Sequence, residues 1–390
     1  MAEAGRNLFT LFTINVVMAI CWYMSSPFIP LFIRSLGASV FLASLVLFTS
    51  GVASTMAMIL SGFLSDRYGE KKLIIFSALI WGLASILYRF STTWEEAIPA
   101  AIIASLSLSL FLPARMSFIV LNAKPSSVAT AYGFMNIAWP VGGILGPVIG
   151  GFIIKSYGWN YFFYFWTVLA LAGALLSLFL REAKDREPTD IRSMVRAGET
   201  AKGLGLFKGS IWVLAAFILA HIVGNTARGI LNTVMPFYIT DIFHRDEADV
   251  GLFFSVGLGV ATLITQVPSG LLADKLGRKR VMVCAVALTP LIPLLLTLSN
   301  DYLIAIILYT IVTGLWSVTW PASVAYLIDL AATSRRGFIV GLRQMAVRLG
   351  FTVGPIVGGY IWDVIGPMAS FYATSIFFAV SLMFLLMLKE

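Results

Sequence analysis

Four polar side chains share one face of a long apolar stretch between residues 211 and 240. Their spacing of i, i+4, i+7 and i+11 is that of one helical face, and they are His221, Asn225, Arg228 and Asn232. His221 lies about 15 Å along such a helix, near the middle of a bilayer if the stretch spans a membrane. An ionisable group at that depth faces protein or a water-filled cavity, so His221 is a candidate for proton transfer and Arg228 for ligand binding. The structural alternatives are a hydrogen bond from His221 to a neighbouring helix and an ion pair between Arg228 and Asp241.

Polar and cationic side chains also occur inside other apolar stretches. Asn15 is the main polar residue of the first stretch, and Arg115 follows Pro113-Ala114 in the fourth. The fifth and eleventh stretches carry similar faces, formed by Tyr132, Asn136 and Trp139 and by Gln344 and Arg348, with Arg343 beside them. No carboxylate lies clearly at mid-depth, so unpaired arginines favour an anionic or zwitterionic ligand. An apolar pocket is the alternative, built from the aromatic residues Trp22, Tyr23, Trp139, Trp316 and Trp320.

Two acids near the ends of apolar stretches are further candidates for proton binding. They are Asp241, after the seventh stretch, and Asp329, at the end of the tenth. Asp329 has a structural alternative, because Arg278 and Lys279 could pair with an acid at such a shallow depth.

Other chemistry is sparse in this sequence. His221 and His244 are too few for an obvious metal site, and Cys21 and Cys284 lie in apolar stretches, so neither a metal nor a disulfide framework is expected. No cofactor is expected either. We find no nucleophile–base motif, nucleotide-binding loop or metal-ligand spacing, and an enzyme is therefore not predicted.

The composition identifies the elements that must position these residues. The chain of 390 residues is 59% hydrophobic and only 12% charged, whereas soluble domains carry about 25% charged residues. We expect twelve membrane-spanning helices at 8–32, 40–64, 73–90, 97–121, 129–154, 160–180, 211–240, 249–273, 281–299, 302–328, 337–362 and 367–388. The predicted domains are a six-helix bundle at 1–180, a cytoplasmic linker at 181–210 and a second six-helix bundle at 211–390.

Two long patterns recur at an offset of 208 residues. Gly62-Phe-Leu-Ser-Asp66-Arg67-Tyr-Gly69 returns as Gly270-Leu-Leu-Ala-Asp274-Lys275-Leu-Gly277, and basic residues follow both copies. The pattern from Gly133 to Gly151 returns from Gly341 to Gly359, and Pro113-Ala114 returns as Pro321-Ala322. Three features at one offset indicate two homologous halves, an arrangement typical of membrane transporters.

Glycines within these patterns predict close packing. Those in the fifth and eleventh stretches repeat at i+4 on one helical face, and they are Gly142, Gly146 and Gly150, then Gly350, Gly354 and Gly358. Small residues let membrane helices approach closely, as we also expect at Gly62 and Gly270. Pro147 and Pro355 each remove a backbone donor and predict a kink, and Gly69 and Gly277 predict tight turns.

Lysine and arginine gather in alternate loops, which predicts that those loops and both termini are cytoplasmic. Arg34, Arg89 and Lys155 fall on the opposite side but near span ends, where long side chains can reach the interface. The net charge of +8 is then a feature of membrane topology. No basic patch interleaves with exposed aromatic residues, so no nucleic-acid partner is expected.

These patterns resemble signatures of the major facilitator superfamily. The segments 62–72 and 270–280 are similar to its loop 2–3 signature and the second-half counterpart, and 133–151 is similar to the fifth-span motif of the drug–proton antiporter branch. The resemblance implies an all-α membrane protein of twelve helices in two pseudo-symmetric six-helix bundles, with the substrate between them and the fifth and eleventh spans at the sliding interface.

The resemblance also implies a cytoplasmic gate. Asp66 would face the eleventh span and Asp274 the fifth, holding the halves together while the cavity faces outward. The gate residues would be Gly62, Asp66, Arg67, Gly69, Gly270, Asp274, Lys275, Gly277, Arg278 and Asp329. The chain departs from the antiporter branch at Arg115, which lacks the Gln-Gly that should follow it, and at the first span, which has Asn15 but no acid.

We therefore expect a secondary active transporter, monomeric in the lipid bilayer of the cell membrane. The main hypothesis is proton-coupled efflux of drugs or other small organic compounds by alternating access. The rival substrate is a small organic anion, such as a carboxylate or a phosphorylated metabolite, bound by the arginines. A non-transporting membrane receptor is the alternative from another class.

Overall fold

The computed structural model describes residues 2–123, 127–181, 211–330 and 336–388. The first half contains α1 (Ala2–Ser25), α2 (Ile29–Ser35), α3 (Val40–Tyr68), α4 (Glu70–Phe90), α5 (Ala97–Asn122), α6 (Val128–Asn136), α7 (Ala138–Tyr157) and α8 (Trp159–Leu178). The second half contains α10 (Ile211–Asp241), α11 (Glu247–Phe254), the π-helix η3 (Ser255–Val260), α12 (Ala261–Leu276), α13 (Arg278–Ala287), α14 (Leu291–Leu298), α15 (Tyr302–Leu330), α16 (Arg336–Val364) and α17 (Pro367–Leu386). The described residues form helices and connecting turns, without a strand.

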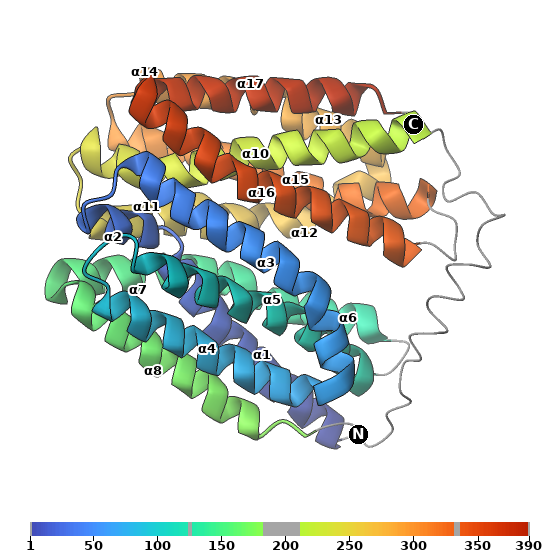
Figure 1. The fold of residues 1–390 in the computed structure, drawn as a ribbon. Coiled ribbons are helices and arrows are strands. Elements are labelled where there is room, and N and C mark those ends of the chain that lie inside the picture. The colour runs from blue at the N-terminus through green and yellow to red at the C-terminus, as the bar shows by residue number, and fades with distance from the viewer. Residues whose placement is uncertain (1, 124–126, 182–210, 331–335, 389–390) are drawn as a thin grey trace.

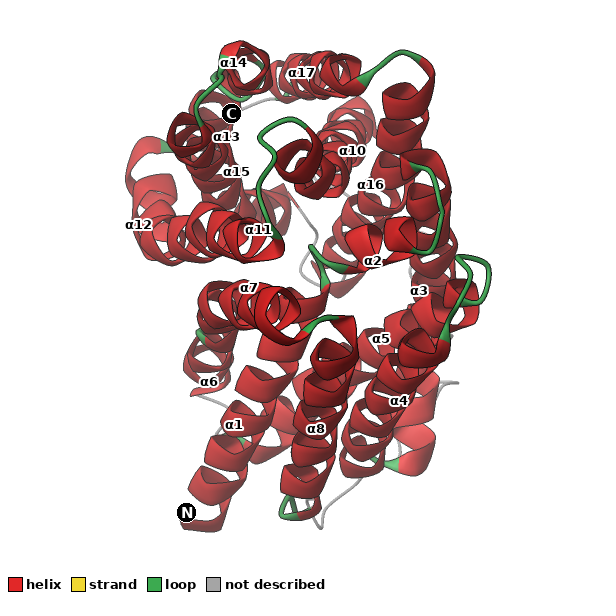
Figure 2. Ribbon diagram, turned by 90° about the vertical axis from the view of Figure 1, so that its left-hand side faces the viewer, coloured by secondary structure: helices red, strands yellow, loops and turns green. Residues whose placement is uncertain are grey.

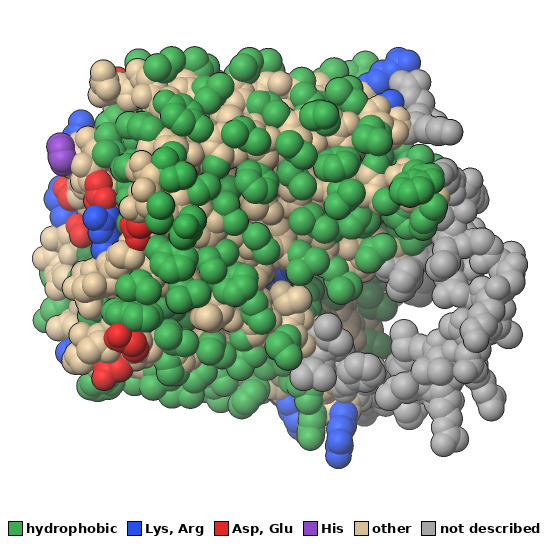
Figure 3. Space-filling model, turned by 45° about the horizontal axis from the view of Figure 1, so that its top comes forward, with side chains coloured by type: hydrophobic (Ala, Val, Ile, Leu, Met, Phe, Trp, Pro, Cys, Tyr) green, Lys and Arg blue, Asp and Glu red, His purple; other side chains and the backbone are tan. Residues whose placement is uncertain are grey.

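The described helices include twelve segments at the positions of the twelve predicted spans. Eleven helical segments are long and apolar enough to span a bilayer. The twelfth is α16, which is 29 residues long and includes Arg343 and Arg348, whose charges lower its hydropathy. Apolar side chains cover the middle of the visible surface and charged side chains gather at its two ends, which fits an apolar core flanked by water (Figure 3).

The repeated loop signature is mostly helical. The segment up to Tyr68 completes α3, and the segment up to Leu276 completes α12. The turn itself is a single glycine in each copy, with φ of 96° at Gly69 and 92° at Gly277. A side chain other than glycine is strained at such angles, which explains the residue type at both turns.

Several predicted spans are interrupted. The first breaks between α1 and α2, the fifth between α6 and α7, and the ninth between α13 and α14. The eighth contains η3, in which Gly257 and Gly259 are buried. Pro147 and Pro355 lie inside α7 and α16, and neither helix ends at its proline.

The helices form two groups that follow the sequence repeat (Figure 1). In the first group α1 packs against α7 and α8, and in the second α10 packs against α16 and α17. Contacts between the groups are made by α3 with α16 and by α7 with α11 and η3. In Figure 2 the molecule is seen from the end that carries α2 and α11. We call this the far end, and the opposite end, where both chain termini lie in Figure 1, the terminal end.

Candidate substrate site

The first half holds one buried arginine in a hydrogen-bonded network. Arg115 of α5 is 3% exposed and donates to the Oδ1 atoms of Asn15, at 3.1 Å, and Asn136, at 3.4 Å. Asn15 in turn donates to the carbonyl oxygen of Met135 at 2.5 Å. Both groups that face the guanidinium are neutral amides, so the positive charge of Arg115 is solvated but not neutralised.

Aromatic rings complete the surroundings of Arg115. Its guanidinium carbon lies 5.7 Å from the ring centre of Tyr132 and 5.8 Å from that of Trp139. Both distances are within the range of cation–π attraction. Its Nε atom is buried and has no hydrogen-bond partner. One donor of this guanidinium is thus available to a polar atom that enters the site.

The second half holds its own buried arginine. Arg343 of α16 is 2% exposed, and its Nε donates to the hydroxyl of Ser323 at 2.9 Å. Its Nη1 donates to the neighbouring Gln344 at 3.2 Å, and its guanidinium carbon lies 5.1 Å from the ring centre of Trp320. Arg343, which the sequence placed only beside the polar face, is therefore the deeper and better-bonded residue, whereas Gln344 is exposed.

Arg228 of α10 lies two residues beyond the middle of its helix and is half-buried. Its guanidinium carbon is 5.5 Å from the ring centre of Phe351, and its charge interacts with the phenols of Tyr23 and Tyr309. No hydrogen bond or ion pair connects it to another residue in the described part of the chain. The sequence-based alternative that Arg228 pairs with Asp241 is wrong, because Asp241 pairs with Arg34.

A series of rings leads from Arg115 of the first half toward Arg228 of the second. Trp139, beside Arg115, packs edge-on against Tyr23 with ring centres 6.2 Å apart, and Tyr23 lies close enough to Arg228 to interact with its charge. Tyr309 lies beyond Arg228 and donates to Asn232 at 2.9 Å. We call this set the central polar site, and its residues are Asn15, Tyr23, Arg115, Tyr132, Asn136, Trp139, Arg228, Asn232 and Tyr309.

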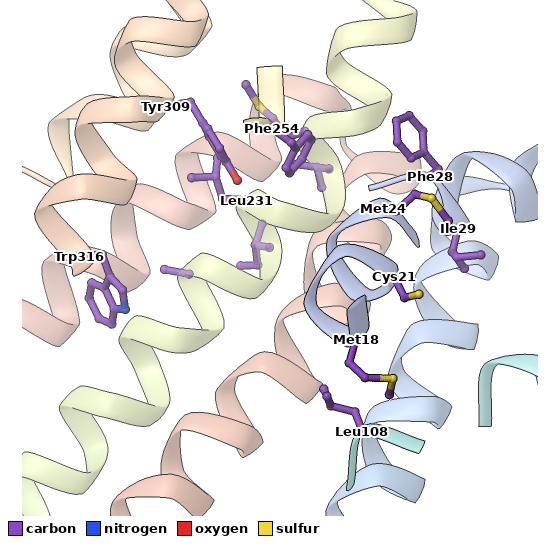
Figure 4. Close-up of a cluster of buried hydrophobic side chains, with 14 of the residues drawn as sticks. Met18, Cys21, Met24, Phe28, Ile29, Leu108, Leu231, Phe254, Tyr309 and Trp316 are labelled. Carbon is purple, nitrogen blue, oxygen red and sulfur yellow. The ribbon is translucent and has the colours of Figure 1, made fainter. Parts of the chain in front are cut away.

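The central polar site adjoins a buried apolar cluster contributed by both halves. The side chains labelled in Figure 4 include Met18, Cys21 and Met24 of α1, Leu231 of α10, and Tyr309 and Trp316 of α15. The interface between the halves thus offers cations, amides and apolar surface together. This combination suits a small organic molecule with one polar end.

His221 and Asn225 are buried on α10 and bond within their own helix. The Nδ1 atom of His221 lies 2.9 Å from the carbonyl oxygen of Phe217, and the two rings stack at 4.1 Å. Asn225 donates to the carbonyl oxygen of His221 at 2.7 Å, and its own Oδ1 has no partner. The alternative of a hydrogen bond from His221 to a neighbouring helix is thus not the bond that the structure shows.

Two ion pairs join the halves at the far end. Arg34 of α2 pairs with Asp241 of α10, and Lys155 of α7 pairs with Asp246 at 2.7 Å. The hydrogen bond from Lys155 lowers the pKa of Asp246, whose carboxylate also accepts from the backbone of Asp249 at 3.1 Å and caps α11. Arg34 and Lys155 lie near the ends of their helices, as predicted, and there they pair with acids of the other half. The sequence feature that indicated acidic partners for these two cations was the cluster of acids at 241–249.

A further polar contact between the halves lies closer to the middle. Arg348 of α16 donates to the hydroxyl of Ser54 of α3 at 3.0 Å. Arg348 therefore bridges the interface between the halves.

The predicted gate at the terminal end is only partly visible. Arg278 pairs with Asp329 and donates to the carbonyl oxygen of Ala325 at 2.6 Å, so this contact ties α13 to α15 within the second half. Asp274, Lys275 and Arg67 are exposed. The side chain of Asp66, and the surroundings of Gly62, lie outside the described residues.

The i+4 glycines pack within each half rather than between the halves. An added methyl group at Gly146 would meet the carbonyl oxygen of Ile20 at 2.7 Å, and one at Gly354 would meet that of Thr226 at 2.6 Å. Gly142, Gly150, Gly350 and Gly358 likewise face α1 or α10 of their own half. Contacts between the halves are made instead by the glycines next in sequence, with Gly143 against Gly259, Gly151 against Glu247 and Gly359 against Ser44. The surface of α7 and α16 that meets the other half therefore lies beside the face that carries the i+4 glycines.

Two repeated groups of membrane-spanning helices with a polar site at their interface define a membrane transporter. The family model described as Major Facilitator Superfamily matches residues 11–226 and 217–390. The chain belongs to the major facilitator superfamily. It is accordingly a secondary transporter and not an enzyme, with a multi-pass arrangement in the plasma membrane.

Individual relatives agree with this assignment. "Multidrug resistance protein 2" of Bacillus subtilis (strain 168) is 25% identical over 300 residues, or 76% of this chain and 74% of the relative. "Multi-drug resistance efflux pump PmrA" of Streptococcus pneumoniae serotype 4 is 26% identical over 372 residues, or 92% and 90% of the two chains. A solved bacterial homolog of the human lysosomal transporter Spinster, inward-facing and occupied, has a TM-score of 0.78 at 13% identity and covers 99% of this chain and 97% of its own.

Proposed function

We propose that this transporter exports organic anions that have an aromatic or other apolar body. The observation that carries the proposal is Arg228, a half-buried guanidinium near the middle of α10 with no hydrogen bond or ion pair to a described residue. A carboxylate or phosphate on the substrate would supply the paired acceptors that a planar guanidinium binds best.

The charges around Arg228 favour the same substrate class. The described ion pairs are Arg34–Asp241, Lys155–Asp246, Arg245–Asp249 and Arg278–Asp329, so each uses a cation outside the central polar site. Arg115, Arg343 and Arg348 are instead held by amide or hydroxyl oxygens. The field between the halves is therefore positive and attracts anions, while Trp139, Tyr23 and Phe351 offer flat apolar surfaces.

The proposed transport cycle is alternating access by the bundles 1–180 and 211–390, as a monomer. The lysines and arginines of the sequence support a cytoplasmic terminal end. The ion pairs at the far end would then close the outer side, and the structure would represent an inward-facing state. Export is supported by the names of the relatives, two of which are multidrug resistance or efflux proteins.

We propose that a proton is exchanged for the substrate at His221. A coupling group must meet both sides of the membrane in turn, but Asp241 and Asp329 lie near opposite ends and are held in ion pairs. His221 is ten residues into α10. Its bond to the carbonyl oxygen of Phe217 places a hydrogen on Nδ1, which leaves Nε2 as the acceptor for a second proton.

A second candidate function is proton-coupled efflux of neutral or cationic lipophilic drugs. The relatives named for multidrug resistance and the aromatic lining of the central polar site favour it. In that case the arginines would serve to hold the helices rather than the substrate.

Uptake into inverted proteoliposomes separates the two candidates. Radiolabelled 1-naphthoate serves as the anionic probe and ethidium as the cationic probe, with wild type, Arg228→Gln and Arg228→Lys. We expect naphthoate transport that falls about tenfold or more in Arg228→Gln, since a hydrogen bond to a charged group is worth about 1.5–3 kcal/mol. Arg228→Lys should retain part of it, because the charge remains but the paired donors do not.

The opposite pattern would reject the anion proposal in favour of drug efflux. That pattern is ethidium transport without naphthoate transport, unchanged in Arg228→Gln.

A further inference from the structure

A half-open cavity of about 510 Å³ lies at the terminal end, apart from the central polar site. It is lined by Arg6 and Thr10 of α1, Lys71 of α4 and residues 178–181 at the end of α8. Among the described residues, the lining contains three cations, Arg6, Lys71 and Arg181, and no acid. A cavity of this charge is suited to an anion.

The cavity lies at the edge of the membrane. Its three helices belong to the spans Gly5–Ser25, Glu70–Phe90 and Trp159–Leu178, which all begin or end there. Leu178 and Phe179, beside the cations, are 56% and 71% exposed. Cationic and apolar groups therefore meet at the depth where lipid headgroups join their acyl chains.

Hydrogen bonds hold the cationic segments in place. The Nζ atom of Lys71 donates to the carbonyl oxygen of Leu178 at 2.7 Å. Asn7 donates to the carbonyl oxygen of Arg181 at 3.0 Å and accepts from its backbone nitrogen at 3.2 Å. Asn7 is itself 4% exposed and donates to Asn122 at 2.7 Å. A site fixed in this way loses little conformational entropy when a ligand binds.

One acid adjoins Lys71 in the sequence. Glu70, which precedes Lys71, is 5% exposed and accepts from the hydroxyl of Ser117 at 2.9 Å. In the second half the positions 208 residues after Lys71 and Arg181 are also lysines, Lys279 and Lys389, whereas the position equivalent to Arg6 is Leu214. Arg6 is thus the cation of this cavity that is particular to the first half.

We propose that this cavity binds the phosphate headgroup of an anionic phospholipid, with Leu178 and Phe179 against its acyl chains. Basic pockets between membrane helices attract such headgroups, and each nearby cation strengthens the attraction. The ligand chemistry is a phosphate diester, which a soluble phosphate ester shares only in part because it has no acyl chains. The bound lipid would tie α1, α4 and α8 together at the membrane surface.

Native mass spectrometry of the full chain in detergent tests the proposal. The protein is titrated separately with phosphatidylglycerol, phosphatidylcholine and glycerol 1-phosphate. The test variant is Arg6→Gln/Arg181→Gln, and the matched control is Lys72→Gln, which removes an exposed cation beside Lys71 that does not line the cavity. Unchanged thermal unfolding confirms that each variant is folded.

We expect wild type and Lys72→Gln to retain phosphatidylglycerol, and the double variant to bind it about thirtyfold more weakly. Phosphatidylcholine and glycerol 1-phosphate should bind weakly to all three proteins. Equal retention of phosphatidylglycerol by the double variant and wild type would overturn the site. Binding of glycerol 1-phosphate as tightly as of phosphatidylglycerol would overturn the assignment to a lipid.

Discussion

The two halves make equivalent contacts with opposite charges at the terminal end. Glu70 follows the turn at Gly69 and accepts a hydrogen bond from Ser117 of α5. Arg278, 208 residues later, follows the turn at Gly277, pairs with Asp329 and donates to the carbonyl oxygen of Ala325 of α15. Residues 117 and 325 are also 208 apart. The duplicated fold therefore preserves the place of a contact but not the chemistry that makes it.

The buried arginines show the same freedom. Arg115 is equivalent to Ser323, and Arg343 is equivalent to Met135. The buried cation is therefore supplied by α5 in the first half and by α16, which is not the equivalent of α5, in the second. Each arginine bonds the amide at the equivalent position, Asn136 or Gln344. The fold determines where a buried cation can be solvated, and the sequence of each half determines which helix supplies it.

The proposed coupling residue belongs to a matched pair. The Nδ1 atom of His221 bonds to the carbonyl oxygen of Phe217, and Thr13, its equivalent in the first half, donates to the carbonyl oxygen of Phe9 at 3.2 Å. Residues 9 and 217 are again 208 apart. The two side chains make the same local bond, and only the histidine can change its charge near neutral pH.

The largest effect is therefore expected for His221→Thr, which gives the second half the residue of the first. The variant should keep the bond to Phe217 and the fold, but lose the group that carries the proton. Accumulation driven by a pH gradient should vanish, while exchange of labelled for unlabelled substrate should continue. Accumulation and exchange are measured with labelled substrate in proteoliposomes, and proton flux is measured with a pH-sensitive interior dye. Proton flux equal to that of wild type would remove His221 from the mechanism.

The next effect compares two glycines at equivalent interface positions. A methyl group on Gly151 would collide with the backbone carbonyl of Glu247, and one on Gly359 would collide with the side chain of Ser44. Rotation of the serine hydroxyl removes the closest contact at Gly359 but leaves those with the Cβ atom of Ser44, at 2.6 Å, and the carbonyl oxygen of Val40, at 2.9 Å. At Gly151 the closest contact, at 2.3 Å, is itself a backbone carbonyl and cannot rotate away. Overpacking costs about 1–3 kcal/mol. Gly151→Ala should thus separate the halves at the far end in about tenfold more molecules, and Gly359→Ala in fewer.

Distances between spin labels across the far end measure this change. Gly146→Ala is the matched control, because its nearest neighbours belong to the first half. It should lower the unfolding temperature without changing the ratio of the two states. Equal shifts in Gly151→Ala and Gly146→Ala would contradict the division into two glycine faces.

A smaller effect separates Glu70 from Arg278. Glu70 is 5% exposed, whereas the side chains of Arg278 and Asp329 are 28% and 57% exposed. A buried hydrogen bond to a charged group is worth about 1.5–3 kcal/mol, and an exposed ion pair about 0–1 kcal/mol. Glu70→Ala should therefore reduce the free energy of unfolding more than Arg278→Ala, as measured by denaturant titration in detergent. The reverse order would show that the ion pair is the stronger contact.

The smallest effect concerns pH at the far end, where the first half supplies both cations and the second half both acids. Lys155 lowers the pKa of Asp246 below its ordinary value of 3.8. A carboxylate with a lowered pKa contributes its stabilisation above the ordinary pKa and loses it as the pH falls through the folded value. The label distance at the far end should thus be constant from about pH 8 to pH 5. A change in this range that is absent in Asp246→Asn would show that the pair titrates there.

Much of the fold could be predicted from the sequence. Eleven of the spans follow from hydropathy, and the two halves follow from the offset of 208 residues. The turns at Gly69 and Gly277 could be predicted because glycine is the residue that adopts a positive φ without strain. Candidate polar residues such as Arg115, His221 and Arg228 were found because a charge is costly in an apolar stretch. These properties are local or periodic, so they can be read without knowing which helices meet.

The partners of those residues depended on tertiary structure. Arg34 and Asp241 are 207 residues apart, and the acids at 241–249 indicate a cationic partner without specifying which cation they meet. The sequence likewise showed glycines on α7 and α16 but not that Gly151 and Gly359, rather than the i+4 series, contact the other half. Tyr23 and Arg228 come together only where α1 of one half faces α10 of the other. The sequence by itself determined which polar groups lie within apolar stretches. The packing of distant helices decided which of them are buried and what each of them binds, because contact energies act over a few ångströms in space and not along the chain.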